Sequence, residues 1–297
     1  MKLFYSAAYT ASSHAFDTTR KARWVAESLV ARPIAGIELC EPQPLSAQQL
    51  ETIHDPEYVA AARTGEPRRL AESQGFSWDA QLWAMVCASN GGTLEAAREA
   101  RRGGRAGSLS SGLHHARRKR GAGFCTFNGL ALAAKTLLNE GAQSVLILDF
   151  DAHCGGGTYS LIKDEPRIWQ ADVATDSFDR YTPKAQLTLD IVSDAAKYLP
   201  TIWRRLAELE TRAPQFDLCL YNAGMDPSEK CGTGGLRGID EAMLAEREEL
   251  VFSWCHERKI PIAFVLAGGY IGGALNEAGL VDLHRLTLTA AVETLKA

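Results

Sequence analysis

Residues 144–153 read SVLILDFDAH, an apolar run that ends in Asp149, Asp151 and His153 at alternate positions. Residues i, i+2 and i+4 of an extended chain lie on one face, so two carboxylates and an imidazole would project together. The apolar run is typical of a strand buried on both faces of a parallel sheet. Burying this polar set without a cation is costly, and a bound metal removes that cost. The alternative is a strand end whose acids reach water or cap the next helix.

Three other segments have the same design. AGSLSSGLHH (106–115), FDLCLYNAGMD (216–226) and IPIAFVLAGGY (260–270) each carry polar or metal-binding residues at the carboxyl end of an apolar run. In an open parallel α/β sheet, ligands bind at the edge where the strands end. The four segments together therefore predict an enzyme.

Amphipathic helical patterns alternate with these strands and predict right-handed crossovers between parallel strands. We expect an α/β fold with three layers, α/β/α, and a mostly parallel central sheet. The opening residues MKLF predict a first strand, and residues 60–80 predict a surface loop. No repeat or linker divides the chain, so residues 1–297 are expected to form a single catalytic domain. Helices are expected over residues 17–32, 84–102, 128–139, 185–210 (after Pro183), 241–258 and 283–296.

Charge, apolar content and cysteine usage exclude several classes of protein. The chain has 32 basic and 36 acidic residues and a net charge of −4, which gives no electrostatic footprint for nucleic acid. No stretch approaches the roughly 20 apolar residues that cross a bilayer. Seven cysteines without a CxxC pair indicate reduced thiols and a cytoplasmic protein. Cys154 stands apart because it directly follows His153.

Asp226 is the residue that would complete a metal site. It follows YNAG at the end of a buried strand, so Asp151, His153 and Asp226 could meet at one sheet edge. Two carboxylates and one imidazole suit Zn²⁺ and leave a coordination position open, although Fe²⁺ or Co²⁺ would accept the same ligands. The local alternative is a turn or N-cap aspartate before Pro227.

Proton-handling residues end the other two strands. A neutral imidazole of His114 or His115 is suited to take a proton from water at neutral pH. Tyr270 follows two glycines, which would let its hydroxyl approach a developing oxyanion. The alternatives are surface histidines leading into a solvated basic run (117–120), and a buried tyrosine after an ordinary turn. Gly155–Gly157 lacks the residues of a phosphate-binding loop.

The strings SGLHHARRKRGAGFCTFN, VLILDFDAHCGGGTY, LYNAGMDPSEKCGTGGL and FVLAGGY, in this order, resemble the histone deacetylase superfamily, which has the arginase/deacetylase α/β fold. The resemblance covers most of the chain, from HAFDTTRKARWVAESL near the N-terminus. That opening, with YNAGMD, TGGL and REELVF, is most similar to the class IV branch and its bacterial deacylase relatives.

The resemblance implies a role for each matching position. It implies that the second histidine acts as general base and acid, that the tyrosine binds the substrate carbonyl, and that an aromatic tunnel holds the acyl-lysine chain. It also implies a monovalent cation, K⁺ or Na⁺, beside the zinc. The implied residues are Asp151, His153 and Asp226 for zinc; His114, His115, Tyr270 and Asp149 for catalysis; Phe124 and Gly123 for the tunnel; and Asp149, Asp151, His153, Asp172 and Val173 for the monovalent cation.

Three positions depart from the family pattern. Gly156 stands where the family has an Asp or Asn that hydrogen-bonds the second histidine, so His115 is expected to be less constrained. Losing an outer partner of this kind typically costs about 10–100-fold. Cys231 replaces a usual acidic residue and puts the shape of the pocket rim in doubt, and Ile271 after Tyr270 is a smaller deviation.

The sequence thus predicts a zinc-dependent amidohydrolase that removes acyl groups from N-acyl-lysine in peptides or proteins, or from a related acylated amine. The class IV resemblance favours long acyl chains over acetyl, and acetylpolyamines are the second substrate class. A rival is a catalytically weakened, metal-containing protein that binds acylated ligands, motivated by Gly156. An arginase-type binuclear centre would need carboxylates that HCGGG does not provide. Oligomeric state stays open.

Overall fold

The computed structural model describes residues 1–12 and 17–293, and these form one eight-stranded sheet in which every pairing is parallel. The predicted α/β fold is therefore confirmed, with a sheet that is entirely parallel. The order across the sheet is β2-β1-β3-β8-β7-β4-β5-β6. The strands are β1 Lys2–Phe4, β2 Glu38–Cys40, β3 Arg105–Ser108, β4 Val145–Asp149, β5 Ile168–Ala174, β6 Leu187–Ile191, β7 Leu218–Ala223 and β8 Ile262–Leu266.

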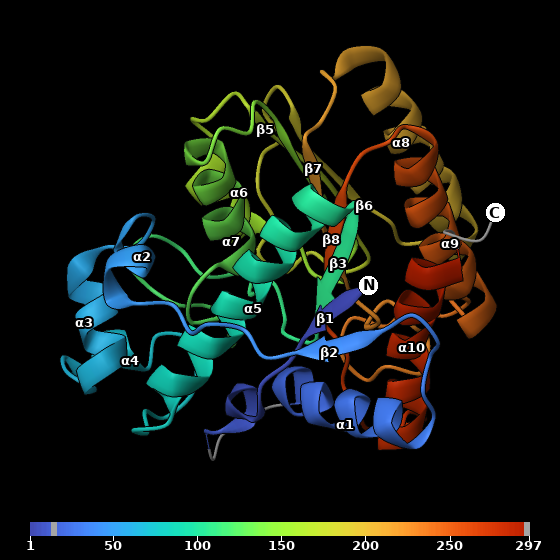
Figure 1. Ribbon diagram of the computed structural model, residues 1–297. Coiled ribbons are helices and arrows are strands. Elements are labelled where there is room, and N and C mark those ends of the chain that lie inside the picture. The colour runs from blue at the N-terminus through green and yellow to red at the C-terminus, as the bar shows by residue number, and fades with distance from the viewer. Residues whose placement is uncertain (13–16, 294–297) are drawn as a thin grey trace.

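Helices cover both faces of this sheet (Figure 1). The helices α5 (Leu82–Gly103), α6 (Gly129–Asn139) and α7 (Gly156–Ile162) pack on one face, and α1 (Asp17–Ala31), α8 (Tyr198–Arg212), α9 (Glu241–Glu257) and α10 (Glu277–Glu293) pack on the other. Short helices α2 (Ala47–Glu51), α3 (Pro56–Thr64) and α4 (Arg68–Ala71) extend the α5 side. Two 3₁₀ turns span Ala7–Thr10 and Ala195–Lys197.

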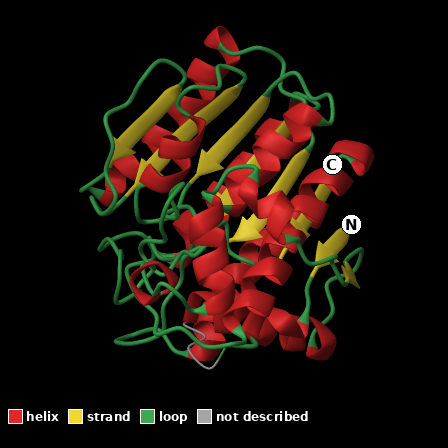
Figure 2. Ribbon diagram, turned by 90° about the vertical axis from the view of Figure 1, so that its left-hand side faces the viewer, coloured by secondary structure: helices red, strands yellow, loops and turns green. Residues whose placement is uncertain are grey.

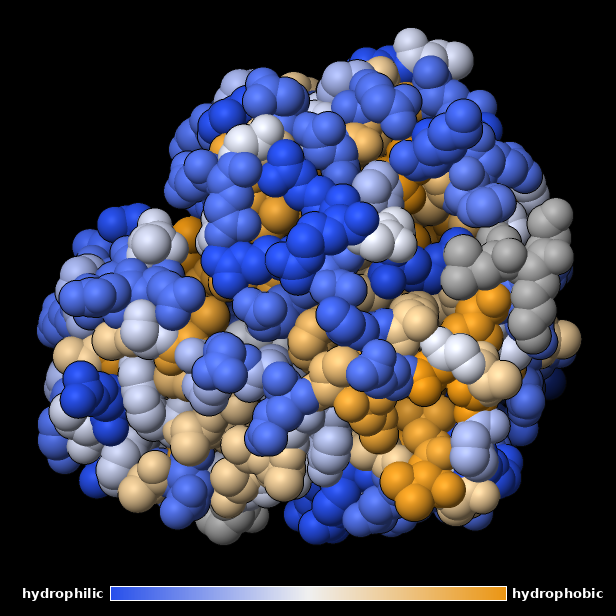
Figure 3. Space-filling view, in the orientation of Figure 1, coloured by the Kyte–Doolittle hydropathy of each residue, from blue (hydrophilic) through white to orange (hydrophobic). Residues whose placement is uncertain are grey.

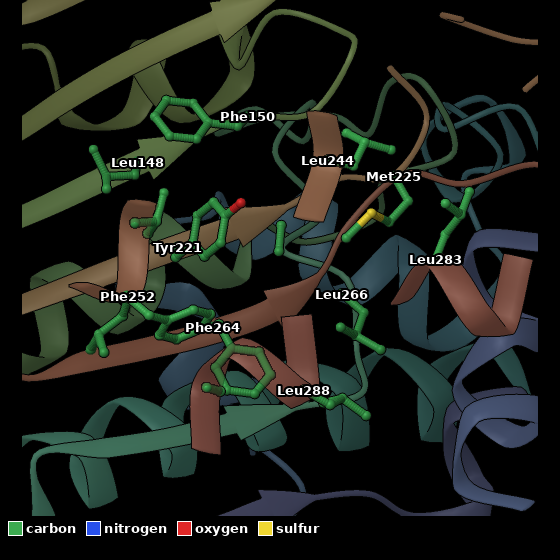
Figure 4. Close-up of a cluster of buried hydrophobic side chains, with 14 of the residues drawn as sticks. Leu148, Phe150, Tyr221, Met225, Leu244, Phe252, Phe264, Leu266, Leu283 and Leu288 are labelled. Atoms are coloured by element: carbon green, nitrogen blue, oxygen red, sulfur yellow. The ribbon is translucent and has the colours of Figure 1, made fainter. Parts of the chain in front are cut away.

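Alternation along β4 shows how the apolar runs form these layers. Leu146 and Leu148 join the cluster under α8, α9 and α10, whereas Val145 and Ile147 join the cluster under α5 and α6. Figure 4 shows the first cluster, where Leu148 and its neighbours on β7 and β8 meet side chains of α9 and α10. Each fully buried aliphatic or aromatic side chain contributes roughly 1.5–3 kcal/mol. The strand ends that carry the polar residues are therefore held rigidly from both sides.

The parallel arrangement brings every strand's carboxyl end to one edge, as the aligned arrows in Figure 2 show. β2 closes one side of the sheet with only three residues and is largely exposed. The face in Figure 3 is mostly hydrophilic, with apolar residues gathered on the side where β2 and α10 lie in Figure 1. Among the described helices, none has the length and apolar character that spanning a bilayer requires.

Two predicted segments were wrong. Residues 185–210 are not one helix: LTLDI forms the edge strand β6, a 3₁₀ turn follows, and α8 begins only at Tyr198. Pro183 accordingly precedes a strand. Residues 60–80 are not purely a loop, because they hold the end of α3 and all of α4.

The other boundaries follow the sequence closely. MKLF forms β1, and Gly141 follows α6 with a φ of +93°, the left-handed backbone that ends many helices. The last helix begins at Glu277, earlier than the expected residue 283. Its predicted end at Lys296, and the start of the family resemblance at His14, lie outside the described residues.

Candidate active site

The four segments singled out in the sequence form adjacent strands, in the order β3-β8-β7-β4. The residues that follow these strands meet at the carboxyl edge of the sheet. After β4 come Asp151 and His153, after β7 comes Asp226, after β3 come His114 and His115, and after β8 comes Tyr270. Segments up to 156 residues apart in the chain (114 to 270) therefore supply one site.

Asp151, His153 and Asp226 form the core of the site. One ligand atom from each lies within 4.8 Å of the others, and all three side chains are buried. His153 Nδ1 lies 3.1 Å from Asp151 Oδ1 and 3.1 Å from Asp226 Oδ2. Neighbouring ligands of a tetrahedral Zn²⁺ stand about 3.3 Å apart, given bond lengths of about 2.0–2.2 Å. Apart from this His153 nitrogen, Asp226 Oδ2 has no hydrogen-bond partner among the described residues, so this trio fits a divalent cation.

The pKa shifts of the trio also favour a bound cation. Burial and the neighbouring Asp151 raise the pKa of Asp226 to about 6. Burial alone would lower the pKa of His153, but hydrogen bonds and charge from Asp151 and Asp226 outweigh it and raise that pKa to about 11. Two buried carboxylates therefore demand a positive charge between them, which either a protonated His153 or a bound metal supplies.

Backbone groups hold the two carboxylates in place. The Gly268 N–H donates to Asp151 Oδ2 over 2.6 Å, and the Ala152 N–H donates to Asp226 Oδ1 over 2.9 Å. A Cβ at position 268 would lie 2.0 Å from Asp226 Oδ2 and 2.5 Å from Asp151 Oδ2. The first glycine of the GGY string is thus required for close approach of the backbone to these two carboxylates.

The tandem histidines lie beside the trio with their rings facing each other. Asp149 Oδ2 lies 2.8 Å from His114 Nδ1, and Asp149 Oδ1 accepts a hydrogen bond of 2.8 Å from Asn222 Nδ2. His114 Nε2 and His115 Nε2 are 3.1 Å apart. Burial opposes the charged form of His114, but Asp149 and Asp151 dominate and raise its pKa to about 10.

The pKa of His115 is lowered, in contrast to that of His114. Burial and the adjacent charge of His114 lower its pKa to about 4. A neutral imidazole whose Nδ1 donates to a carboxylate has an unprotonated Nε2, and in His115 that nitrogen lies 3.1 Å from His114 Nε2 and accepts its hydrogen bond. Gly156 led us to expect that His115 is less constrained, but Asp179 Oδ2 lies 2.9 Å from His115 Nδ1. Asp179 comes from the loop after β5 and not from the HCGGG segment.

Phe178 contacts His115, and Phe124 directly follows Gly123, whose backbone lies against the same His115 ring. Phe178 is 49% exposed and packs edge-on against His115, with ring centroids 4.9 Å apart. Phe124 is 41% exposed and packs against Phe76 at 5.0 Å. A Cβ on Gly123 would lie 2.5 Å from the His115 ring and 2.9 Å from that of Phe178, so only glycine fits between them. Apolar rings this exposed beside buried histidines can hold an aliphatic chain.

Tyr270 lies on the other side of the trio. It is partly buried, and its ring is edge-on to His153 with centroids 6.2 Å apart. Burial and the charge of Asp226 raise the pKa of its hydroxyl, which therefore stays protonated and able to donate. Cys231 is buried, and its thiol donates to the carbonyl oxygens of Thr233 and Tyr270. The position that departs from the family pattern thus contacts the Tyr270 backbone.

Asp149 and Asp172 are direct neighbours on β4 and β5, and both are completely buried. Asp172 Oδ2 accepts a 2.7 Å hydrogen bond from the Gly155 N–H, whereas Asp172 Oδ1 has no partner among the described residues. Burial and the charge of Asp149 raise the pKa of Asp172 well above its usual range. An unsatisfied oxygen beside a second buried carboxylate fits a cation, and Val173 follows on the same strand.

Phe178 and Asp179 were not predicted from the sequence, because residues 168–174 were not recognised as the strand β5. Residues that follow a strand of this sheet reach the active edge, so recognising IWQADVA would have placed both near the site. Arg117 also differs from expectation: it pairs with Asp179 instead of belonging wholly to a solvated basic run. Cys154 is buried, and burial raises its thiol pKa, which disfavours the reactive thiolate.

Comparison with known proteins agrees with this architecture. Residues 14–281 match the histone deacetylase domain. Histone deacetylase 2 of Arabidopsis thaliana is 27% identical over 292 residues, covering 91% of this chain and 75% of the relative. An uncharacterised protein of Picosynechococcus sp. is 32% identical over 259 residues, covering 86% and 85%. The crystal structure of an acetylpolyamine aminohydrolase from Burkholderia pseudomallei has the same fold, with a TM-score of 0.81, 18% identity and 99% of both chains covered.

Proposed function

Because the chain belongs to the histone deacetylase family, whose members are hydrolases of amides, we propose that it is a zinc-dependent deacylase. Its proposed substrates are N-acyl-lysine residues of peptides or proteins, or related acylated amines. The observation that carries the proposal is the buried trio of Asp151, His153 and Asp226, with the unsatisfied Asp226 Oδ2 at its centre. In this proposal the trio holds Zn²⁺, with Fe²⁺ or Co²⁺ as alternatives, and Asp149, Asp151, His153, Asp172 and Val173 hold K⁺ or Na⁺.

A divalent ion bound by the trio would polarise the acyl carbonyl and lower the pKa of water from 15.7 to around 7. The chain's own residues supply the remaining chemistry. His115 takes the proton of the attacking water at Nε2, because its pKa of about 4 keeps that nitrogen unprotonated at neutral pH. His114, charged and paired with Asp149, stabilises negative charge that develops beside it.

Tyr270 completes the proposed mechanism. Its protonated hydroxyl donates to the oxygen that gains charge when the carbonyl is attacked. His115, once protonated, returns its proton to the departing amine, so that no net charge accumulates. Phe124, Gly123 and Phe178 are proposed to enclose the methylene chain that leads to the amide and to exclude bulk water from it.

Two substrate classes fit this site. The exposed rings of Phe124 and Phe178 suit the four methylenes of a lysine side chain, and the class IV resemblance favours a long acyl chain. Acetylpolyamines also present methylenes beside an amide, and a protein of the same fold bears that substrate in its name. Assaying one preparation against acetyl-, octanoyl- and myristoyl-lysine peptides and acetylspermidine separates the classes by kcat/KM.

Asp226→Ala tests the metal-dependent mechanism directly. We expect this variant to lose both stoichiometric zinc and hydrolysis, because it removes a ligand that nothing else in the trio replaces. Asp282→Ala is the matched control, since Asp282 is half exposed and pairs with Arg32 at the surface. Full hydrolysis by Asp226→Ala, or by enzyme freed of metal with a chelator, would refute the proposal.

The rival function, an acyl-ligand-binding protein without turnover, loses its main support. It rested on Gly156, which lacks the side chain that orients the second histidine. His115 nevertheless has a carboxylate partner at 2.9 Å. Tight binding of an acyl-lysine peptide without hydrolysis, by protein that carries one zinc per chain, would favour the rival.

A further inference from the structure

We propose that Asp179 is the positioning residue for His115, and that the loop after β5, which also carries Phe178, supplies it in place of the HCGGG segment. This inference rests on the proposed deacylase function. It names a residue that orients the general base without contacting the substrate. It also explains why Gly156 is compatible with catalysis.

Asp179 has three hydrogen-bond partners, which together determine its orientation. Its Oδ2 lies 2.9 Å from His115 Nδ1 and accepts a 3.0 Å hydrogen bond from the Gly157 N–H. Its Oδ1 accepts from Arg117 Nη2, and Arg117 Nη1 donates to the Gly156 carbonyl over 3.1 Å. The side chain is 7% exposed. A buried carboxylate held this way fixes both the ring orientation and the tautomer of the histidine it faces.

A side chain at position 156 and Asp179 in its observed position exclude one another sterically. A Cβ at position 156 would lie 2.1 Å from the Asp179 carbonyl oxygen and 2.7 Å from Asp179 Oδ1. Asp179 itself has a φ of +61°, a left-handed conformation that aspartate tolerates better than most residues. A side chain at 156 would therefore expel the loop that carries Asp179. The carboxylate that faces His115 therefore comes from the loop after β5 and not from the HCGGG segment.

Asp179 lies next to Phe178, one of the residues proposed to enclose the substrate. Phe178 directly precedes Asp179, and its ring packs edge-on against both His115 and His153, with centroids 4.9 Å and 6.1 Å away. The Phe178 carbonyl accepts a 3.0 Å hydrogen bond from the Cys154 N–H, which anchors this loop beside the metal trio. An acyl chain that packs on Phe178 would therefore contact the residue that directly precedes Asp179 in the chain.

Asp179→Ala and Arg117→Met, compared in the zinc-loaded enzyme, test the role. We expect Asp179→Ala to lower kcat about 10–100-fold with little change in KM and full zinc content. Arg117→Met removes the same ion pair but leaves Oδ2 facing His115 and Gly157, so we expect its kcat to fall much less. If Asp179 only braces the loop, both variants will lose kcat equally, or KM will rise instead, and the inference fails.

A measurement on the wild-type enzyme keeps the test independent of variant folding. Nitrogen-15 spectra of labelled histidines should show His115 as the neutral tautomer with its proton on Nδ1, identified by loss of the signal in His115→Asn. A proton on Nε2 would overturn the inference. Absence of hydrolysis in the wild type would instead refute the proposed function, and it would leave this tautomer result as the test of the Asp179 contact.

Gly156→Ala provides a second perturbation that leaves all polar side chains intact. Its Cβ would displace the Asp179 backbone, so we expect kcat to fall toward that of Asp179→Ala. The double variant should be no slower than the slower single variant, because both changes break the same contact. Multiplicative losses in the double variant would show that the two positions act separately and would contradict the inference.

Discussion

Replacing Gly268 by alanine should abolish tight metal binding without removing any ligand. The added Cβ would lie 2.0 Å from Asp226 Oδ2, whereas ordinary van der Waals contacts begin near 3.4 Å. The oxygen would have to retreat by about 1.4 Å, compared with the tolerance of about 0.2 Å for metal–ligand distances. Asp151 Oδ2 is crowded at 2.5 Å as well. Two displaced carboxylates should weaken zinc binding by more than about 100-fold, or at least about 2.7 kcal/mol.

The assay is competition for zinc against a chromophoric chelator, with metal content measured after dialysis. Gly232→Ala is the control, because a Cβ there meets nothing within 4 Å although the residue lies in the loop after Asp226. Circular dichroism and a melting curve confirm that both variants fold. A Gly268→Ala enzyme that retains zinc with wild-type affinity would show that the backbone at β8 does not constrain the ligands, and the geometric argument would be wrong.

Two further predictions concern stability. Burial, with a smaller effect of the Arg118 charge, lowers the pKa of His54 to about 4, and its ring bridges the Arg117 carbonyl and the Asn128 N–H. As the pH falls from 6.5 towards 4, His54 becomes protonated in the unfolded chain before it does so in the folded protein. The free energy of unfolding of the wild type, measured in urea, should therefore fall by roughly 2 kcal/mol more than that of His54→Gln between pH 7.5 and 5. Equal losses in the two proteins would contradict this. Arg247→Met should lower the free energy of unfolding by about 3–5 kcal/mol, because it leaves the buried Glu248 carboxylate without its charged partner. Adding Glu248→Gln should recover part of that loss. Additive losses in the double variant would refute the pairing.

The sequence was most informative where strands are apolar on both faces. Val145–Asp149, Leu218–Ala223 and Ile262–Leu266 are such strands, and each was predicted along with the polar residues that follow it. Buried strands of a parallel sheet need apolar residues at every position, which makes them visible without knowledge of the fold. Because their carboxyl ends share an edge, the proximity of Asp151, His153 and Asp226 could be predicted from strand ends alone.

β5 was missed for the converse reason. Gln170 and Asp172 interrupt its apolar pattern, since Gln170 contacts Gly155 and Asp172 faces Asp149 at the candidate cation site. These two polar residues thus hide the strand, and with it the loop that carries Phe178 and Asp179. β6 was missed because LTLDI is a half-buried edge strand adjoining a strongly amphipathic helix, so its short alternation was absorbed into the helical pattern.

The order β3-β8-β7-β4 has a consequence for biogenesis. Asp151 and Asp226 are 75 residues apart, and they approach only when β4 has paired with β7, while Gly268 seals the ligands only when β8 has added to β7. A ribosome-bound fragment that ends before residue 268 therefore lacks a preformed cavity for the ion. Acquisition of the proposed ion is therefore expected to be a late event, coupled to completion of the central sheet, and its retention would report on whether that assembly step has occurred.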